Sequence, residues 1–243
     1  MTEKPAISLF FPVYNDENTV RIVAEKAIRI LEEVSVDYEI IIINDASPDN
    51  SGNIANEMAS RYTKIKVIHH EKNQGYGAAI ITGLKHSKFE FICFTDGDDE
   101  YDIADFKKLI KLKDFYDLII TFRYVRIYST WRIFVSKLYN ILLRFLFKTR
   151  YRDISTGLRM IRKSLANELD LCSTSPFIGA EITVKSMLKG YRVGEVGIQT
   201  FPRKFGRGAS VTSANIWKTI KDMYKVHRQI FSDSYDLPGE RSR

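Results

Sequence analysis

The 243-residue sequence predicts a doubly wound α/β fold, in which a mostly parallel central sheet is flanked by helices. Short apolar runs alternate with segments of helical periodicity through the first half of the chain, and this alternation is typical of βαβ units. One run, residues 38–43, is apolar almost throughout, as expected for a parallel strand buried on both faces. Polar residues follow three of the runs directly, where parallel strands would end.

The N-terminal half is expected to supply four strands and three helices. The first strand ends at Pro12, because proline has no N–H to donate within a central ladder. Acids precede the first helix, whose apolar positions run from Val20 to Leu31 at helical spacing. The strands are expected at residues 7–11, 38–43, 66–69 and 89–94, and the other two helices at about 51–62 and 78–86.

The C-terminal half continues the alternation with longer helices. A helix at about 103–112 and a strand at 117–122 lead into a segment of different character. The later elements are a helical segment over 131–146, a strand near 158–161, a helix at about 179–188, a strand at 192–198 and an amphipathic helix at about 211–231. A loop at 201–210 combines glycines with cations, which suits a mobile segment that binds phosphate.

The segment between Leu118 and Lys163 is strongly cationic, with eleven Lys or Arg residues and a single acid, Asp153. Apolar and aromatic residues from Trp131 to Leu146 recur in it at helical spacing. A basic amphipathic helix with aromatic residues is typical of binding to a membrane surface. A helix packed on a core with a solvated cationic face has the same pattern. Basic residues among aromatics also suit single-stranded nucleic acid.

Composition places the chain among ordinary globular proteins, with 44% hydrophobic and 28% charged residues. Its net charge of +7 favours an anionic partner such as phosphates, nucleic acid or an acidic membrane surface. Cys93 and Cys172 lie far apart, which is typical of a reducing compartment. The N-terminus lacks a signal peptide's apolar segment, and no apolar run approaches the roughly 20 residues of a membrane span. We expect a cytoplasmic protein that is soluble or peripheral to a membrane.

An acidic stretch, Thr-Asp-Gly-Asp-Asp-Glu at 95–100, directly follows the fourth expected strand. Alone, such a stretch is more often a solvated turn than a metal site. An EF-hand loop is excluded, since counting from Asp96 places Tyr101 where that loop needs glycine. Two other polar clusters, at 12–17 and 44–49, also follow strands, and ligands of doubly wound sheets bind at the carboxyl ends of strands. This coincidence favours carboxylates that share one divalent cation.

Three of these segments carry recognisable motifs: Pro-Val-Tyr-Asn-Asp-Glu at 12–17, Asn-Asp-Ala-Ser at 44–47 and Asp-Gly-Asp at 96–98. They resemble the N-terminal signatures of inverting family 2 glycosyltransferases with the GT-A fold. The later motifs resemble the branch of dolichyl-phosphate mannose synthases and polyprenyl-phosphate glucosyltransferases. They comprise Arg123-Tyr124, Trp131-Arg132 with Ser136, the run 153–159, and Gly190-Tyr191 leading to Glu195, Phe201, Arg203, Gly206 and Ser210.

Carried over by position, the resemblance implies one GT-A domain over residues 1–231 that ends in an amphipathic helical appendage. Its nucleotide-sugar half would be about 1–122 and its acceptor half about 123–231, with a flexible tail at 232–243. The donor's base and ribose would lie against Pro12, Tyr14, Glu17 and Asp45. Asp96 and Asp98 would hold the diphosphate and a Mg²⁺ or Mn²⁺ ion, with Glu100 as a third metal ligand. Arg123, Arg132 and Ser136 would bind the acceptor's phosphate, and Arg203 would close over the donor.

Two acceptor chemistries are compatible with these residues. A lipid phosphate needs little base catalysis but needs cations to position it, and Arg123 and Arg132 lie in a segment almost without acids. A sugar hydroxyl needs a carboxylate base near the anomeric carbon, and Asp153 and Glu181 are the candidates. Asp153 also suits an ion pair with a neighbouring arginine, and Glu181 an exposed acid in the first turn of a helix.

The leading hypothesis is a metal-dependent inverting transferase that moves one sugar from a UDP- or GDP-linked donor to a polyprenyl phosphate. The alternative is transfer to a sugar hydroxyl in polysaccharide or glycolipid synthesis. The expected catalytic residues are Asp98, Asp153, Arg123 and Arg132. A non-catalytic nucleic-acid-binding protein would use the +7 charge but has no use for carboxylates at strand ends, so we expect no nucleic-acid partner. An oligomer is compatible with the sequence.

Overall fold

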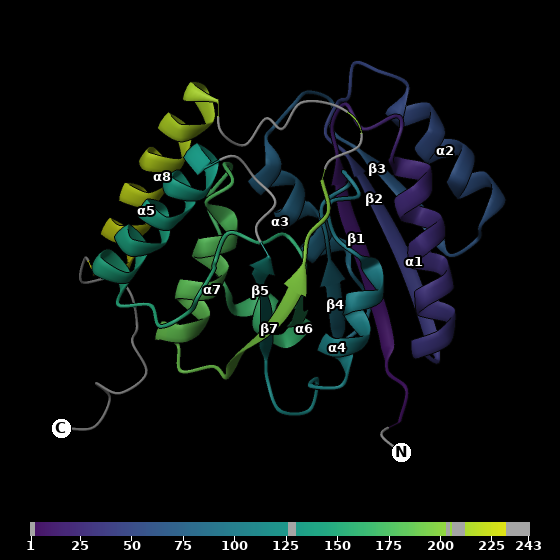
Figure 1. Cartoon of the computed structure of the whole chain (residues 1–243). Coiled ribbons are helices and arrows are strands. Elements are labelled where there is room, and N and C mark those ends of the chain that lie inside the picture. Colours follow the sequence, from purple (N-terminus) through teal and green to yellow (C-terminus); the bar gives the residue numbers. More distant parts are fainter. Residues whose placement is uncertain (1–2, 126–129, 203–204, 206–211, 232–243) are drawn as a thin grey trace.

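The computed structural model describes residues 3–125, 130–202, 205 and 212–231. Seven strands form one sheet in the order β3-β2-β1-β4-β6-β5-β7 (Figure 1). The strands are β1 (Ala6–Val13), β2 (Asp37–Asn44), β3 (Ile65–His69), β4 (Phe91–Phe94), β5 (Leu118–Val125), β6 (Arg159–Arg162) and β7 (Val193–Gln199). All neighbouring pairs are parallel except those of β6, which runs antiparallel to both β4 and β5. The predicted mostly parallel α/β sheet is therefore confirmed.

Helices cover both faces of the sheet, and two apolar cores separate them from the strands. The helices are α1 (Val20–Val34), α2 (Ser51–Arg61), α3 (Tyr76–His86), η1 (Ile103–Asp105), α4 (Phe106–Ile110), α5 (Thr130–Phe147), α6 (Lys163–Glu168), α7 (Ile178–Leu188) and α8 (Ser213–Phe231). One core joins α1, α2, η1 and α4 to one face, and the other joins α3, α6 and α7 to the opposite face. Alternate residues of β1, such as Leu9 and Phe10, point into the two cores, as the period of a strand requires.

A third apolar cluster lies outside the sheet layers and joins α5 and α8 to the outer side of α7 (Figure 1). Leu143 and Phe147 of α5 meet Val226 and Ile230 of α8 there, and the ring of Phe147 lies 5.7 Å from that of His227. The expected helical appendage is thus a pair of helices stacked on α7. No helix within the described residues is both long enough and apolar enough to cross a membrane.

The expected elements are present, with shifted ends. The predicted strand at 89–94 is only Phe91–Phe94, and the predicted helix at 103–112 divides into η1 and the one-turn α4. The short helix α6 was not predicted, because six residues are too few to show a helical period. The expected tail at 232–243 and most of the expected loop at 201–210 lie outside the described residues.

The direction of β6 positions the candidate site. Phe94, the last residue of β4, pairs with Arg159, the first residue of β6. The loop that precedes β6 therefore lies beside the carboxyl end of β4, where Asp96 begins the acidic turn. If β6 were parallel to β4, its carboxyl end and the loop that follows it would lie beside Asp96 instead.

Candidate active site

A cavity of about 870 Å³ opens at the carboxyl ends of the parallel strands. The expected site residues that line it are Pro12, Tyr14, Asp45, Asp96, Asp98, Glu100, Arg123 and Ser136. Carboxylates from three strand ends form one part of the wall, and Arg123 with residues 154–157 forms another. Helices α5 and α8 complete the lining with mostly apolar side chains. Segments far apart in the sequence thus meet in one concave site, as is usual for small-molecule binding.

The Asp96 carboxylate is positioned by two neighbours that the sequence did not indicate. The Tyr76 hydroxyl at the start of α3 donates to Asp96 Oδ1 over 2.6 Å. Burial first, and then the Asp96 charge, raise the pKa of Tyr76 well above its usual value, so the hydroxyl keeps its proton for this bond. Gly157 lies against the same carboxylate, where a Cβ atom would collide with Oδ2. The close approach explains why glycine occupies position 157.

Asp98 and Glu100 lie in the buried turn that follows Asp96 in the chain. The backbone N–H of Glu100 donates to Asp98 Oδ1 over 3.1 Å, and the two residues are only 8% and 4% exposed. Between them, Asp99 has a positive φ of 59° and its carboxylate accepts from Lys26 over 2.6 Å. A non-glycine residue in this conformation is strained, and such strain is common at functional sites.

The carboxylates fit a divalent ion that is shared with a phosphorylated ligand. Within the described part of the chain, no three Asp, Glu, His or Cys side chains converge as a metal site, so Asp96, Asp98 and Glu100 do not form a closed cage. Mg²⁺ is usually held by one or two carboxylates together with substrate phosphates. Asp96 and Asp98, which both line the cavity, match that smaller donor set. The expected third ligand, Glu100, stays a prediction.

Asp45 fixes the loop between β3 and α3. Its carboxylate accepts from His70 Nδ1 over 2.7 Å, from the N–H of Gln74 over 2.8 Å and from the N–H of Gly75 over 2.9 Å. The other ring nitrogen of His70 lies 3.0 Å from the Thr82 hydroxyl. Asp45 thus lines the cavity and also shapes the wall beside it. His70 was not among the expected site residues, because only the fold brings it to Asp45.

Glu17 and Tyr14 take different places at the rim. The carboxylate of Glu17 accepts from the N–H of Asn50 over 3.1 Å, while the Glu17 N–H donates to Asp49 over the same distance. These bonds tie the loop after β1 to the loop after β2, and Glu17 does not line the cavity. Tyr14 lines it and is 44% exposed. Its N–H donates to Asp16, a further cavity carboxylate that was not expected.

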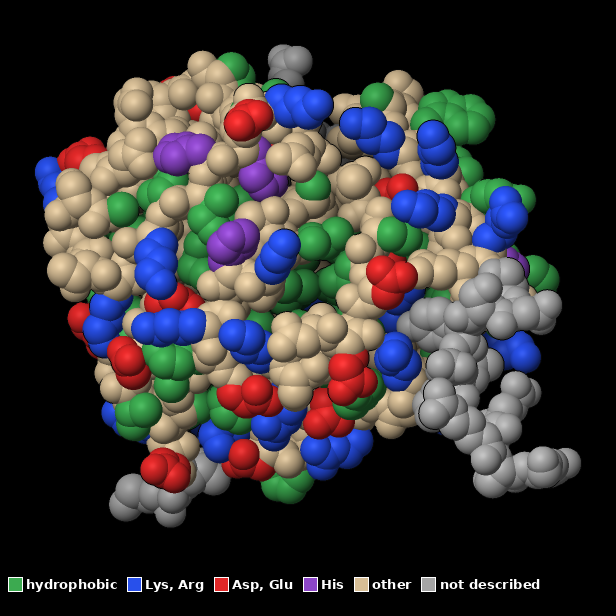
Figure 2. Space-filling model, turned by 180° about the vertical axis from the view of Figure 1, so that it is seen from behind, with side chains coloured by type: hydrophobic (Ala, Val, Ile, Leu, Met, Phe, Trp, Pro, Cys, Tyr) green, Lys and Arg blue, Asp and Glu red, His purple; other side chains and the backbone are tan. Residues whose placement is uncertain are grey.

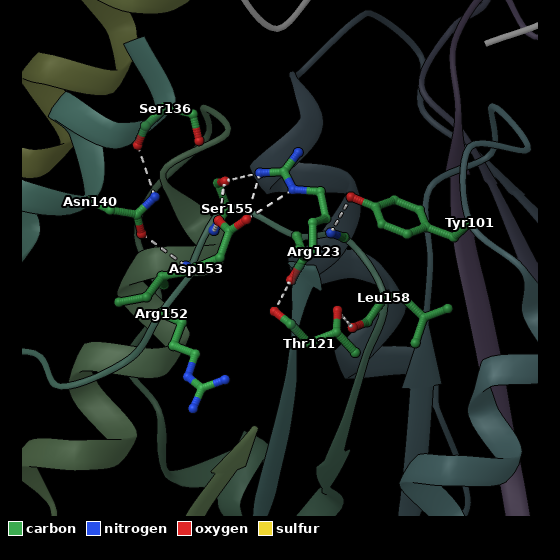
Figure 3. Close-up of polar contacts among 12 residues, drawn as sticks. Tyr101, Thr121, Arg123, Ser136, Asn140, Arg152, Asp153, Ser155 and Leu158 are labelled. Carbon is green, nitrogen blue, oxygen red and sulfur yellow. Dashed lines mark hydrogen bonds and ion pairs between the residues drawn. The ribbon is translucent and has the colours of Figure 1, made fainter. Parts of the chain in front are cut away.

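Arg123 forms a buried ion pair with Asp153 (Figure 3). Its Nε and Nη2 atoms lie 2.9 and 2.8 Å from Asp153 Oδ2, and Nη2 also donates to the Ser155 hydroxyl over 2.6 Å. Burial acts to raise the pKa of Asp153, but the Arg123 charge and the hydrogen bonds from Ser155 outweigh it, so the pKa is lowered. Asp153 is an ion-pair partner, one of its two expected roles, and does not itself line the cavity. A carboxylate with a lowered pKa is also a weaker base.

The loop that carries Asp153 is attached to three elements (Figure 3). Asn140 of α5 accepts from the N–H of Ile154 over 3.1 Å and donates to the Ser136 carbonyl over 2.9 Å. The Gly157 N–H donates to the Tyr101 hydroxyl over 2.9 Å. Arg159 is buried behind the loop and donates to the carbonyl groups of Ile154, Thr156 and Gly179 and to the Thr183 hydroxyl. The loop is therefore held rigidly next to Asp96.

Glu181 lies outside the cavity, which corrects both of its expected roles. It is fully buried in α7, where its carboxylate accepts from the N–H groups of Cys172 and Ser173. The buried Lys185 ammonium lies 2.6 Å from the same carboxylate and also donates to the carbonyl of Asp170. Glu181 is neither an exposed helix acid nor a base at the site, and its ion pair holds the loop before α7 in place.

The structure does not describe the side chains of two cationic residues that were expected in the site. Arg203 lies outside the described residues, and the side chain of Arg132 is likewise not described. Their expected contacts with acceptor and donor stay predictions.

Comparison with known proteins identifies the family. Residues 8–170, well over half of the chain, match the family model described as Glycosyl transferase family 2. The chain belongs to this family. The uncharacterized glycosyltransferase EpsJ of Bacillus subtilis is 39% identical over 105 residues, which cover 43% of this chain and 29% of that protein. A dolichyl-phosphate β-glucosyltransferase of Trichomonas vaginalis is 32% identical over 123 residues, which cover 45% of this chain and 38% of that protein. The chain thus matches less than two fifths of either relative's length.

Solved structures confirm the GT-A fold. Glucosyl-3-phosphoglycerate synthase of Mycobacterium tuberculosis, in complex with Mn²⁺, UDP and glucosyl-3-phosphoglycerate, superposes with a TM-score of 0.69 at 18% identity. The match covers 91% of this chain and 80% of that one. The same enzyme with Mn²⁺, UDP-glucose and phosphoglyceric acid gives a TM-score of 0.68 at 19% identity, covering 92% and 80% of the two chains.

Proposed function

We propose that this chain transfers one sugar from a nucleotide-diphosphate sugar to a polyprenyl phosphate at the cytoplasmic face of a membrane. One observation carries the proposal: a single cavity has buried carboxylates at the strand ends, an ion-paired arginine opposite them, and an apolar extension between two helices. A nucleoside diphosphate with a divalent ion suits the first part. A phosphate monoester on a long hydrocarbon chain suits the other two. The free thiols of Cys93 and Cys172 are consistent with a reducing compartment.

The carboxylate end of the cavity is assigned to the donor. Pro12, Tyr14 and Asp45 would flank its base and ribose, with Asp45 as a hydrogen-bond acceptor in the shaped wall that Gln74 and Gly75 help to form. Asp96 and Asp98 would hold a Mg²⁺ or Mn²⁺ ion together with diphosphate oxygens. Such an ion, when bound, stabilises the negative charge that develops on the leaving diphosphate. The solved neighbours contain Mn²⁺ with UDP or UDP-glucose, which supports this choice of donor and metal.

The Arg123 end is assigned to the acceptor phosphate. Asp153 holds the guanidinium in one orientation, so that less conformational freedom is lost when a phosphate binds beside it. An acceptor that already carries negative charge on its attacking oxygen needs positioning more than deprotonation. Arg132 and Ser136 remain proposed partners of the same phosphate. The relative described as a dolichyl-phosphate β-glucosyltransferase supports an acceptor of this class.

Transfer to a sugar hydroxyl is the alternative, and the two candidate bases argue against it. Glu181 is in a buried ion pair away from the cavity, and Asp153 has a lowered pKa beside Arg123. A hydroxyl acceptor depends on a base that can take its proton. The alternative would have to use another cavity carboxylate, such as Asp16 or Glu100.

Offering one radiolabelled donor to a polyprenyl phosphate and to an oligosaccharide acceptor in parallel tests the assignment. We expect label only in the lipid product, with Asp98→Ala abolishing it. Label only in the oligosaccharide would establish the alternative. Glu181→Gln is unsuitable for telling the two apart, because it breaks a buried ion pair and would destabilise the fold under either hypothesis.

A further inference from the structure

Two of the helices that line the cavity, α5 and α8, also expose apolar side chains. On α5 the exposed apolar residues are Phe134, Leu138, Ile141, Leu142 and Phe145, and on α8 they are Ile216, Trp217, Ile220, Tyr224 and Phe231. Three of these exposed residues, Leu142, Ile216 and Ile220, also line the cavity. We call these ten residues the apolar face. It adjoins the cavity through the residues that belong to both.

The apolar face is distinct from the sides by which the two helices pack. At about 100° of rotation per residue, the exposed apolar positions of α8 fall within about 100° of its circumference. Its buried residues Met223, Val226 and Ile230 occupy the adjoining arc of about 60°. On α5 the exposed positions lie almost opposite the buried Leu143 and Phe147. The apolar surface of each helix therefore extends well beyond the side that is packed, and packing on α7 does not explain the exposed part.

Cations adjoin the apolar face, and acids are nearly absent from it. Lys137, Arg144 and Lys148 flank the part of the apolar face that lies on α5, a helix without any Asp or Glu. The exposed cations of α8 are Lys218, Lys221, Lys225 and Arg228. Its single acid, Asp222, is turned inward and accepts from the N–H groups of Thr174 and Ser175. In the view from behind, α5 and α8 lie toward the right, and the coloured surface there carries Lys, Arg and hydrophobic side chains with few acidic ones (Figure 2).

We infer that the apolar face docks onto an anionic phospholipid bilayer, with the cavity opening toward the acyl chains. Exposed apolar residues bordered by cations are the pattern by which helices lie in a membrane interface. A second copy of this chain would place the same cations opposite each other in a two-fold interface, which is unfavourable. The docking itself does not depend on the proposed function, but the identity of the molecule that enters the cavity does. If that molecule is a polyprenyl phosphate, its phosphate could reach Arg123 while its hydrocarbon chain stays in the bilayer.

Flotation of the full chain with vesicles tests the docking. We expect binding to phosphatidylcholine vesicles that contain phosphatidylglycerol, and binding at least about tenfold weaker to phosphatidylcholine alone, since each Lys or Arg near an anionic surface adds about 1 kcal/mol. Added salt should weaken the binding, because it screens surface charges. Equal binding to both kinds of vesicle, or to neither, would overturn the inference.

A double variant locates the contact. Trp217 and Phe145 are 72% and 81% exposed, and neither lines the cavity. Trp217→Glu with Phe145→Glu should lower vesicle binding by about tenfold or more, because two aromatic side chains no longer enter the interface. Phe115→Glu is the matched control, since Phe115 is 64% exposed on the connection between α4 and β5. Circular dichroism checks folding, and Lys221→Glu with Lys225→Glu gives a second test that replaces no apolar residue.

The outcomes separate docking from the proposed function. If the Trp217 and Phe145 variant binds vesicles like the wild type, the inference is wrong. A wild-type dimer in sedimentation velocity that this variant dissociates, with no vesicle binding, would assign the face to a second copy instead. With a short polyprenyl phosphate dispersed in detergent, the variant should keep wild-type transfer rates. Wild-type vesicle binding without any transfer would contradict the proposed function while supporting the docking.

Discussion

The two ends of the cavity are stabilised in different ways. At the carboxylate end, Asp45 accepts from backbone N–H groups and His70, and Asp96 accepts from a buried tyrosine hydroxyl. At the other end, one ion pair orients Arg123, and the adjoining helices expose apolar side chains. Backbone N–H groups set by the fold need no further partner to keep their direction. Under the proposed assignment, the donor end is already formed in the free chain, whereas the acceptor end would be completed by the membrane surface on which we infer that it docks.

The strongest test of this contrast removes a buried carboxylate of the donor end. Asp98→Ala should reduce transfer by about a thousandfold or more, since a bound divalent ion is worth several kcal/mol of transition-state charge stabilisation. Steady-state rates at saturating donor and acceptor measure it. Asp114→Asn, at an exposed carboxylate outside the cavity, is the control and should keep full activity. Activity within tenfold of the wild type would refute the donor assignment.

A smaller effect is expected from crowding Asp96 without removing it. Gly157→Ala places a methyl group where the Asp96 carboxylate lies, so the carboxylate must shift. We expect about a hundredfold loss of kcat/KM for the donor, because displacement of a positioned group by about 1 Å costs that much. Gly197→Ala, whose nearest neighbours are the side chains of Phe122 and Tyr124, is the control. An unchanged donor KM and kcat in Gly157→Ala would show that Asp96 is not needed at its present position.

At the acceptor end, Arg123→Lys should raise the KM for the lipid phosphate about tenfold and leave the donor's affinity unchanged. A lysine ammonium keeps the charge but lacks the planar fork that can contact Asp153 and a phosphate together. Kinetics with each substrate varied in turn provide the test. Arg61→Lys on α2 is the control. Equal effects on both substrates would show that the two ends are not independent.

The Arg123–Asp153 pair also predicts a dependence of stability on pH. The pKa of Asp153 is lowered in the folded chain, so the pair adds stability above the unfolded value of about 3.9 and loses it as the pH falls through the folded value. Asp153→Asn should therefore lower the Tm at neutral pH, by the loss of roughly 3–5 kcal/mol. The difference should shrink only at pH values below about 3.9. Thermal melts over an acid series would contradict this if the difference were the same at every pH.

The smallest effect is expected at His70, which acts through Asp45. His70→Ala removes one of the donors that orient the carboxylate, and we expect the donor KM to rise about tenfold with little change in kcat. His70→Asn, whose side-chain amide can replace Nδ1 as a donor, should restore most of the affinity. His86→Ala, at an exposed histidine of α3, is the control. A fall in kcat alone would place His70 in another role.

The sequence predicted the parts of the site that depend on strand ends, because parallel strands bring their carboxyl ends to one edge. Asp45, Asp96, Asp98 and Arg123 all line the cavity as expected. The predictions for Glu181 were wrong because this helix is buried, so that Glu181 pairs with Lys185, four residues later, inside the protein.

Contacts across the sheet could not be predicted from local patterns. Tyr76 reaches Asp96 only because α3 packs on β1, the neighbour of β4 in the sheet, and His70 reaches Asp45 only because β3 and β2 are neighbours. The antiparallel direction of β6 was equally hidden, since a four-residue strand carries no sign of its direction in its sequence. That direction decides which loop meets Asp96.

The position of β6 also limits how the polypeptide can be divided. Strand β4 is bordered by β1 on one side and by β6 on the other, and β6 follows the long helix α5 in the chain. A chain cut after residue 122 would leave one edge of β4 open, with β5 lacking both β6 and β7. Open edges of apolar strands recruit other chains and aggregate. The two halves should therefore be soluble only when both are produced together. During synthesis, the N-terminal half should complete its sheet only after the C-terminal half has been translated.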